Sequence, residues 1–443
     1  MKAHSLLLAI AFSVECAQSL RNIVYFDQYH TTTLPPRTVT AGITHVIMAF
    51  ANSSLFVGDT PGQYTPFMPV DDVRALLDEH AQVGIAIGGW GDTAGFGEGA
   101  KTDSSRKAYA KNVATMLDTH GFDFLDVDWE YPGGNGDDYK KVPNANKTDE
   151  IVTFPLLLQE IGTAIGNRTL SIAVPGLKRD MIAYTREQST KIWNAVDFVN
   201  IMAYDLINRR DNVTKHHTDV DGSLAAVQNY LDLGLCASKI NLGFAFYAKY
   251  FQTEAGVNCT ATPVGCPIKK AENDDGSDAG TSGATTFETA NVAPPLPPTN
   301  LTTTSDGTCG ASTYFTCAGH AEAPCCSQYG FCGAADAFCG AGCQSGYGNC
   351  TDTGRTTAES FVDALKSGWT DEKAGGQWWW DEEAELFWTF ETVALIQRKF
   401  KEIVTAKGLG GAFSWSLGED SYDWSHLLAI TEEVNKTEQQ AAG

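Results

Sequence analysis

The chain has 443 residues, with 54 acidic and 31 basic side chains, so its formal net charge is -23 at pH 7. A phosphate backbone would repel such a chain, which excludes nucleic acid as a partner and favours a neutral or weakly cationic ligand. The length exceeds one ordinary domain of ~150 residues and allows a large catalytic domain plus a smaller module.

The first 19 residues, MKAHSLLLAIAFSVECAQS, have the pattern of a secretion signal. A basic start precedes an apolar run from Leu6 to Val14, and small residues follow at Ala17 and Ser19. The apolar run is about ten residues long, whereas a membrane span needs ~20, and no other segment reaches that length. We therefore predict a secreted, extracellular protein with no membrane partner, and expect a monomer.

The glycosylation sequons and the distribution of cysteines are also typical of an extracellular protein. Eight of the twelve cysteines lie between Cys309 and Cys350, which in a secreted chain indicates a module held by disulfides rather than a metal site. The candidate glycosylation sites are Asn52, Asn146, Asn167, Asn212, Asn258, Asn300, Asn349 and Asn435.

Eight apolar, β-rich runs alternate with amphipathic helical patterns along the chain. The runs cover residues 22–26, 44–50, 83–89, 122–130, 170–175, 197–205, 239–247 and 410–417. Repeated β-then-α units predict an α/β fold, a parallel (β/α)8 TIM barrel. An open doubly wound sheet is the alternative, but it usually has fewer strands and a Gly-rich phosphate loop that is not found here.

A long insertion interrupts the barrel pattern, because about 130 residues separate Tyr247 from Trp378. It contains a Pro-rich spacer, "PPLPP", and a cysteine cluster too small to fold on an apolar core alone. The predicted domains are a signal (1–19), a first barrel part (20–255), a loop and Pro/Thr-rich linker (256–305), a cysteine-rich module (306–352) and a second barrel part (353–443).

The fourth run, GFDFLDVDWEYP at residues 121–132, holds an unusual number of acids for a buried strand. Alternation places Asp126, Asp128 and Glu130 on one face, rising about 6.6 Å per pair toward the barrel mouth, where barrel enzymes do their chemistry. Neighbouring carboxylates raise one another's pKa, so we expect Glu130 to keep its proton near neutral pH. That arrangement suits general-acid cleavage of a glycosidic bond.

The spacing Asp123-x-x-Asp126-x-Asp128-x-Glu130 resembles the DxxDxDxE signature of the family 18 glycoside hydrolases, the chitinases of (β/α)8 fold. "AIGGW" (86–90), "MAYD" (202–205) and "GGAFSWSL" (410–417) resemble the motifs of the family's third, sixth and eighth strands. "YFDQY" and "THVIMAFA" resemble its first two strands. The resemblance implies a chitinase like those of filamentous fungi, acting on chitin and chitooligosaccharides without a metal or cofactor.

The resemblance also implies roles for individual side chains in a retaining mechanism in which the substrate's own acetamido group is the nucleophile. Glu130 would be the general acid, Asp128 would orient the acetamido group, Asp126 would support Asp128, and Tyr204 would bind the acetamido carbonyl. Trp415 would form the floor under the sugar. The implied substrate-binding residues are Tyr25, Tyr29, Phe50, Trp90, Tyr131, Met202, Asp205, Tyr247 and Trp415.

Three residues depart from the family pattern. Phe124 replaces a usual Gly and should fill the lower lumen of the barrel. Ala86 replaces a Ser, which removes a hydroxyl near Asp126. Lys249 replaces an Arg, which exchanges a bidentate fork for a point charge.

Residues 325–350, with the upstream Cys309 and Cys317, resemble a hevein-type chitin-binding module. Cysteine arithmetic alone allows 105 pairings of eight cysteines. The resemblance implies four disulfides, Cys309–Cys326, Cys317–Cys332, Cys325–Cys339 and Cys343–Cys350.

The same resemblance implies that the module binds sugar through one hydroxyl and three flat rings, those of Ser327, Tyr329, Phe331 and Phe338. Outside the module, we expect Cys259 and Cys266 to pair across their short loop. Cys236 is left over, and we expect it to be a buried thiol.

Two other functions share much of this pattern. A chitin-binding lectin on the same barrel typically lacks the motif's glutamate, so Glu130 argues against it. An endo-β-N-acetylglucosaminidase acting on N-glycans shares the acidic motif, but the hevein-like module, the MAYD segment and Trp415 favour chitin. The sequence therefore predicts a secreted chitinase that hydrolyses β-1,4 bonds between N-acetylglucosamine units.

Overall fold

The computed structural model describes residues 19–288, 291, 301–310, 313–327, 329–340, 343–350 and 355–442. The predicted secretion signal, apart from its last residue, and the "PPLPP" spacer lie outside the described residues. Among the helices in these ranges, none combines the length and apolar character that crossing a bilayer requires.

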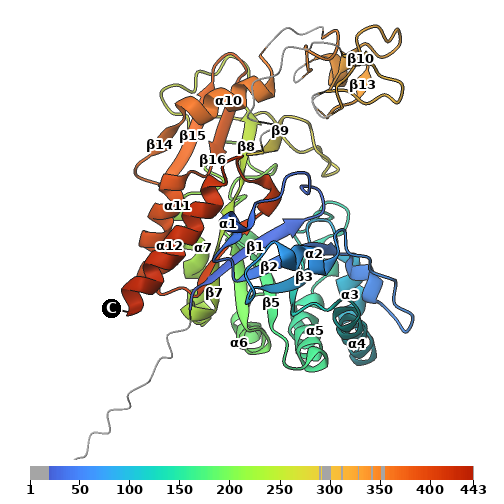
Figure 1. Cartoon of the computed structure of the whole chain (residues 1–443), viewed down its shortest axis with the longest axis vertical. Coiled ribbons are helices and arrows are strands. Elements are labelled where there is room, and N and C mark those ends of the chain that lie inside the picture. The colour runs from blue at the N-terminus through green and yellow to red at the C-terminus, as the bar shows by residue number, and fades with distance from the viewer. Residues whose placement is uncertain are drawn as a thin grey trace, which may run out of the picture.

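Eight parallel strands close into a barrel in the order β1-β17-β7-β6-β5-β4-β3-β2, which confirms the predicted fold (Figure 1). All eight coincide with the runs read from the sequence. Their bounds are β1 Arg21–Asp27, β2 His45–Ala51, β3 Gln82–Gly88, β4 Phe124–Asp128, β5 Leu170–Pro175, β6 Phe198–Met202, β7 Ile240–Ala245 and β17 Gly411–Trp415.

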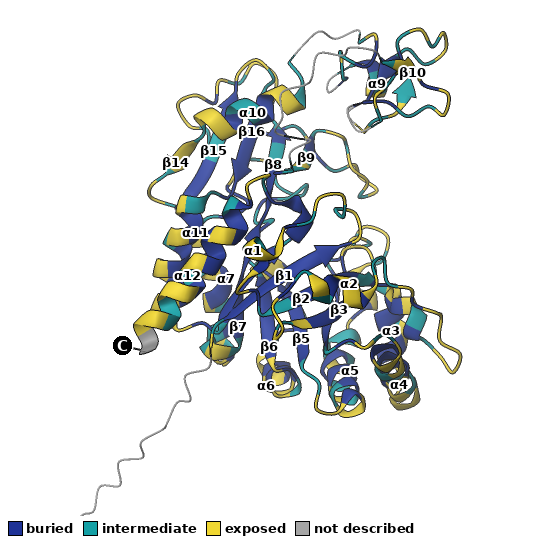
Figure 2. Ribbon diagram, in the orientation of Figure 1, coloured by how far each residue is buried: buried dark blue, intermediate teal, exposed yellow. Residues whose placement is uncertain are grey.

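Helices surround the barrel with their apolar sides inward and their polar sides exposed (Figure 2). In α4 the Thr102 side chain accepts from the Ser105 amide as part of a capping box, and Gly121 ends the helix at φ 72°. The barrel helices are α1 Arg37–Thr40, α2 Val70–Ala75, α3 Ala94–Ala100, α4 Asp103–His120, α5 Glu150–Ile165, α6 Arg186–Ala195, α7 Val220–Asp232, α11 Val393–Lys399, continued by a π-helix η5 Phe400–Thr405, and α12 Ser425–Ala442. The 3₁₀ turns are η1 Ser53–Phe56, η2 Asn144–Asn146, η3 Lys178–Asp180, η4 Ala237–Lys239 and η6 Leu417–Glu419.

Aromatic side chains fill the lower lumen of the barrel. Phe124 is fully buried there, as predicted, and its ring packs with His45 and Phe198. A Cβ atom at Gly84 would lie 2.6 Å from the Phe124 ring, so glycine on β3 makes room for phenylalanine on β4. The lumen is therefore a packed core that opens only at the carboxyl ends of the strands.

A second, five-stranded antiparallel sheet lies beside the barrel, in the order β14-β15-β16-β8-β9 (Figure 1). Its strands are β8 Tyr247–Gln252, β9 Ser282–Thr286, β14 Trp369–Asp371, β15 Gly376–Asp381 and β16 Leu386–Phe390. The sequence analysis did not predict this sheet. It assigned Tyr247 to the seventh barrel strand, residues 256–305 to loop and linker, and residues 353–443 to the barrel.

One face of this sheet is covered by α10, Thr357–Ser367. The Trp388 indole donates to Ser360 Oγ at 2.8 Å, and its ring stacks on Phe361 at 5.0 Å. Tyr250 contacts Trp388 on the same face. Because neighbouring residues of a strand point to opposite faces, Lys249 points to the other face, toward the mouth of the barrel.

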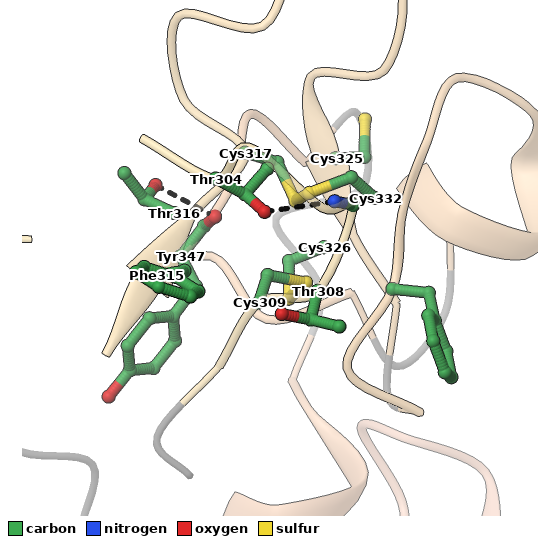
Figure 3. Close-up of a disulfide and its surroundings, with 12 residues drawn as sticks. Thr304, Thr308, Cys309, Phe315, Thr316, Cys317, Cys325, Cys326, Cys332 and Tyr347 are labelled. Carbon is green, nitrogen blue, oxygen red and sulfur yellow. Dashed lines mark hydrogen bonds between the residues drawn. A yellow bond between two sulfur atoms is a disulfide. The ribbon is translucent and has the colours of Figure 1, made fainter. Parts of the chain in front are cut away.

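The cysteine-rich module is a compact unit with little regular structure. It contains β11 Phe315–Thr316, β12 Cys325–Cys326 with β13 Cys332–Gly333, and α9 Asp336–Cys339. Strand β10 Thr302–Thr303, which precedes residue 306, pairs with β11. Figure 3 shows Cys309 and Cys317 with their partners, and the Thr316 hydroxyl, which donates to the Tyr347 carbonyl at 2.9 Å. The disulfides, the same five pairs named from the sequence, are Cys259–Cys266, Cys309–Cys326, Cys317–Cys332, Cys325–Cys339 and Cys343–Cys350.

The prediction for Cys236 is wrong, because this free cysteine is exposed. It precedes the 3₁₀ turn η4 that leads into β7, and its backbone carbonyl accepts from the Lys239 amide at 2.9 Å. The approach to a strand lies on the protein surface here, so proximity to an apolar run in sequence did not imply burial.

Candidate active site

A cleft of about 720 Å³ crosses the carboxyl-terminal mouth of the barrel. Its floor comes from the ends of three strands. Asp128 ends β4 and Glu130 follows it, Tyr204 and Asp205 follow β6, and Trp415 ends β17. Parallel strands place their carboxyl ends at the same edge, which explains how residues far apart in sequence meet here.

Asp128 and Glu130 are both buried at the base of this cleft, with 3% and 9% of their surface exposed. Among the described residues, Asp128 Oδ1 has no hydrogen-bond partner. A buried carboxylate oxygen without a partner costs free energy, so this atom is poised to accept a hydrogen bond from a molecule in the cleft.

The protonation of this pair follows chiefly from burial. Burial raises the pKa of Glu130 to about 7, although a hydrogen bond from Tyr131 opposes the shift, and the charges of Asp205 and Asp180 add to it. Burial likewise raises the pKa of Asp128, with further contributions from Glu130 and Asp126. The sequence analysis attributed the raised pKa of Glu130 to the stacked acids, whereas the low solvent access of the strand end is the larger cause.

Asp126 lies one layer deeper and is fully buried. Its carboxylate accepts hydrogen bonds from Ser171 at 2.6 Å, Tyr25 at 2.8 Å and Asn200 at 3.4 Å. Burial raises the pKa of Asp126 to about 6, and these three donors oppose the shift. Asp126 therefore lies beneath the cleft and does not line it.

Tyr25 differs from its predicted role as a substrate contact. It is 1% exposed, it does not line the cleft, and its hydroxyl donates to Asp126 while accepting from Asn200 at 3.0 Å. The family resemblance identified Tyr25 as a residue of the site but did not give its depth in the lumen.

Asp205 is held ionised by three neighbours, Lys249, His217 and Tyr247. The Tyr247 hydroxyl donates to Asp205 Oδ1 at 2.8 Å, and the Lys249 ammonium lies 3.0 Å from Oδ2. Burial alone would raise the pKa of Asp205, but Lys249 and, to a smaller extent, His217 and Tyr247 lower it well below its usual value. Lys249 thus forms an ion pair with Asp205, although it lacks the bidentate guanidinium of an arginine.

The predicted substrate contacts other than Tyr25 all line the cleft. The Phe50 and Trp415 rings stack with centroids 5.5 Å apart. Trp90 and Tyr29 lie at the rim, with 51% and 74% of their surface exposed. The full set comprises Tyr29, Phe50, Trp90, Tyr131, Met202, Asp205, Tyr247 and Trp415.

Loop residues that the sequence analysis did not name form the remaining wall. The Tyr139 hydroxyl, from the loop after β4, donates to Glu272 in the loop between β8 and β9. The Arg210 guanidinium lies 3.7 Å from the centroid of the Tyr139 ring. The other unpredicted lining residues include Asn135, Asp137, Leu177, Asp180 and Arg209. They fall in irregular segments, where no periodicity marks a position.

Two groups among the described residues have the spacing of metal ligands. Cys309, Cys317 and Cys332 are engaged in disulfides and cannot ligate. Asp27, His30 and Glu419 form the second group, beside the cleft rather than in it. Within the described part of the chain, the acids of the cleft floor form no such group.

In the cysteine-rich module, Tyr329 and Phe331 present their rings to solvent, with 71% and 55% of their surface exposed. Phe338 is half-buried, and its ring lies over Gly333, where an added Cβ would be 2.2 Å away. Ser327 is buried, and its hydroxyl accepts from the Phe331 amide at 3.3 Å. The module thus exposes two aromatic rings, whose flat faces are open to apolar contacts.

The sequence profile of the glycosyl hydrolases family 18 matches residues 21–420. The chain belongs to this family. As a family 18 glycosyl hydrolase, it carries the family's acidic strand at β4, with Asp128 and Glu130 facing the cleft.

Curated relatives of this family 18 hydrolase include chitotriosidase-1 of Mus musculus, 30% identical over 273 residues, which cover 55% of this chain and 56% of that protein. Chitinase 1 of Aphanocladium album is 26% identical over 280 residues, which cover 53% of this chain and 62% of the relative. The matched region thus spans less than two thirds of either relative.

Solved structures share the fold. A chitinase of Rhizomucor miehei matches with a TM-score of 0.63 and 16% identity, covering 93% of this chain and 99% of that one. A family 18 chitinase of Cycas revoluta, solved as a double mutant with (GlcNAc)4, matches with a TM-score of 0.61 and 17% identity, covering 94% and 99%.

Proposed function

We propose that this protein is a chitinase that hydrolyses β-1,4 bonds between N-acetylglucosamine units by a retaining, substrate-assisted mechanism. The carrying observation is the buried pair of Asp128 and Glu130 at the end of β4, with one Asp128 oxygen unpartnered, facing Tyr204 and Trp415 across the cleft. Family membership supports glycoside hydrolysis, and the similarity to a chitotriosidase and a chitinase supports chitin as the substrate.

In the first step, protonated Glu130 donates its proton to the glycosidic oxygen as the bond from the anomeric carbon to that oxygen breaks. The carbonyl oxygen of the substrate's 2-acetamido group forms a new bond to the anomeric carbon and gives an oxazolinium ion. In the second step, ionised Glu130 takes a proton from a water molecule that attacks the anomeric carbon, and the bond from the acetamido oxygen to that carbon breaks, which restores the neutral 2-acetamido group. The sugar is released with its original configuration, and Glu130 is protonated again.

The fixed charges of the site suit this positively charged intermediate. Asp128 Oδ1 would accept the acetamido N–H and offset the developing charge, and Asp126 would add negative potential from below. Burial and the charges of Asp128 and Glu130 raise the pKa of Tyr204, so its hydroxyl keeps its proton and can donate to the acetamido oxygen. Trp415 would lie under the distorted sugar ring.

The replacement of Glu130 by Gln tests the acid. The amide keeps the shape but has no proton to donate, so we expect turnover of a soluble N-acetylglucosamine tetramer to fall by roughly 10²–10⁴-fold while binding stays near that of the parent. Asp137→Asn, which alters another cleft-lining carboxylate that has no part in the proposed chemistry, is the matched control. Hydrolysis at the parental rate by the Gln variant would remove Glu130 from its assigned role.

Product analysis distinguishes the substrate classes. Chitin oligomers and an N-glycan are incubated with the same enzyme preparation. We expect the oligomers to be cleaved and the N-glycan to remain intact. A thiazoline analogue of the oxazolinium ion should inhibit competitively, because the site is complementary to that intermediate. Cleavage of the N-glycan alone would identify an endo-β-N-acetylglucosaminidase, and binding of chitin oligomers without cleavage would identify a lectin.

We also propose that the cysteine-rich module binds chitin surfaces and that the protein acts outside the cell, where its disulfides persist. Tethering raises the local concentration of the catalytic site at an insoluble substrate but does little for a soluble one. Replacing Tyr329, Phe331 and Phe338 together by Ala should therefore weaken hydrolysis of particulate chitin and change kcat on a soluble tetramer by less than about threefold. Equal losses on both substrates would make the module part of the cleft.

A further inference from the structure

A histidine beside the cleft lies among three carboxylates from three separate segments of the chain. His30 follows β1, and its Nδ1 lies 2.9 Å and 3.1 Å from the two oxygens of Asp27. Glu419, from η6 after β17, lies 3.5 Å from the same nitrogen. Glu288, which follows β9, lies 3.6 Å from Nε2.

Nδ1 of His30 hydrogen-bonds Asp27, and Nε2 lies within ion-pair distance of Glu288. A ring that carries both protons places a donor N–H toward Asp27 and a positive charge beside Glu288. Asp27 is saturated by other donors as well, because it accepts from the Tyr29 amide at 2.8 Å and from the Ser416 hydroxyl. A carboxylate whose oxygens already accept this many protons suits an imidazolium better than a metal ion. These three carboxylates are the charged groups that face His30 among the described residues.

The cluster fixes two cleft aromatics through their chain neighbours. Ser416, bound to Asp27, directly follows Trp415, and Tyr29 directly precedes His30. The two segments also touch closely, since a Cβ at Gly418 would lie 1.8 Å from the His30 carbonyl oxygen. Glu419 Oε2 is buried and has no hydrogen-bond partner among the described residues.

We propose that His30, as an imidazolium, is a positioning residue that holds Trp415 and Tyr29 in place for the sugar chain. The sugar chain as ligand rests on the proposed function, whereas the positive charge of His30 does not. Burial alone would lower the pKa of His30, but Asp27, Glu419 and Glu288 raise it to about 9. Burial raises the pKa of Glu419 to about 8 despite the charge of His30. The stability that the charge of His30 contributes is therefore complete below its ordinary pKa of ~6.5 and is lost as pH rises through about 9, and over the same rise Glu419 changes from neutral to ionised near pH 8.

Binding measurements in a Glu130→Gln background separate this effect from titration of the catalytic acid. We expect the Kd for an N-acetylglucosamine tetramer, measured by calorimetry, to rise about tenfold between pH 7.5 and pH 10. Adding His30→Gln should give the weaker binding already at pH 7.5 and a flat profile above it. His30→Lys keeps a cation with a pKa near ~10.4 and should restore part of the affinity at pH 7.5 and retain it to about pH 9.5.

His80→Gln is the matched control, because His80 is exposed near the start of β3, on the opposite side of the barrel from the cleft. It should leave the affinity and its pH dependence unchanged. A steep pH dependence that persists in the His30→Gln variant would overturn the proposal, as would a loss of affinity on dialysis against EDTA, which would assign the cluster to a metal.

Imidazole NMR of the full chain tests the charge without any sugar. The resonance that disappears in His30→Gln should titrate with a midpoint near 9, and a midpoint near the ordinary ~6.5 would overturn the proposal. If the Glu130→Gln protein binds no oligomer at any pH while His30 still titrates near 9, the proposed function fails and the imidazolium assignment stands.

Discussion

Replacing Tyr25 by Phe tests whether the Tyr25 hydroxyl acts through its hydrogen bond to Asp126 or, as the family resemblance implied, through contact with the substrate. The change removes one of three donors to the fully buried Asp126, at 2.8 Å, and touches no cleft-lining surface. A hydrogen bond to a charged group contributes about 1.5–3 kcal/mol, and one pKa unit corresponds to about 1.36 kcal/mol. Since Ser171 and Asn200 remain, we take the lower end and expect the pKa of Asp126 to rise by about one unit.

The sign of the kinetic effect follows from that pKa. Burial already raises the pKa of Asp126 to about 6, and loss of a donor disfavours the ionised form further. We expect the acid limb of the kcat profile on a soluble tetramer to move up by about one pH unit, so kcat at pH 5 falls about tenfold. At pH 8, where Asp126 is ionised in both proteins, the ratio of the two rates should approach one, and KM should stay unchanged.

Tyr109→Phe is the matched control, because Tyr109 is also fully buried but its hydroxyl has no partner among the described residues. Removing an unpaired buried hydroxyl should leave the pH profile unchanged and the stability equal or higher. A KM for the Tyr25→Phe variant that rises more than about threefold, with an unmoved acid limb, would refute the reasoning and restore Tyr25 as a substrate contact.

Three further results are expected. Because burial raises the pKa of Glu130 to about 7, kcat/KM should fall on the alkaline side with a midpoint near 7, and a rate that climbs through pH 9 would contradict a carboxylic acid as proton donor. The side chains of Lys399 and Glu391 are 0% exposed and 2.7 Å apart, so Glu391→Gln should lower the free energy of unfolding by about 3–5 kcal/mol in urea, whereas replacing both by apolar residues should cost less. Gly84→Ala should destabilise by about 1–3 kcal/mol because its Cβ meets the Phe124 ring, and the cost should shrink in a Phe124→Ala background if that contact is the cause.

The barrel could be predicted because each of its strands has a local signature. In β4, apolar residues alternate with Asp126 and Asp128, and this pattern gives both the strand and the face that carries the acids. The same periodicity placed Phe124 in the lumen. Tyr25 was assigned to the cleft by the resemblance of its motif, and no local pattern shows that it lies one layer beneath the cleft.

The second sheet and the loop wall could not be predicted in this way. Strand β8 continues almost directly from β7, so Tyr247 was assigned to the barrel, while the partner strand β16 is recruited from a distant part of the chain. Tyr139 and Glu272 meet only because two irregular loops fold toward each other. The charge of His30 likewise depends on Glu288 and Glu419, which no spacing in the sequence connects with it.

The insertion between β7 and β17 also sets the order in which the barrel can be completed during synthesis. Strand β17 pairs with both β1 and β7, yet it begins at Gly411, long after β7 ends at Ala245. At ~5–20 residues per second, a ribosome needs roughly 10–30 s to supply the intervening chain. Throughout that interval β1 and β7 present unpaired edges to other chains. A partly made protein is therefore most exposed to aggregation at this stage, and chaperones that cover strand edges would act before the eighth strand arrives.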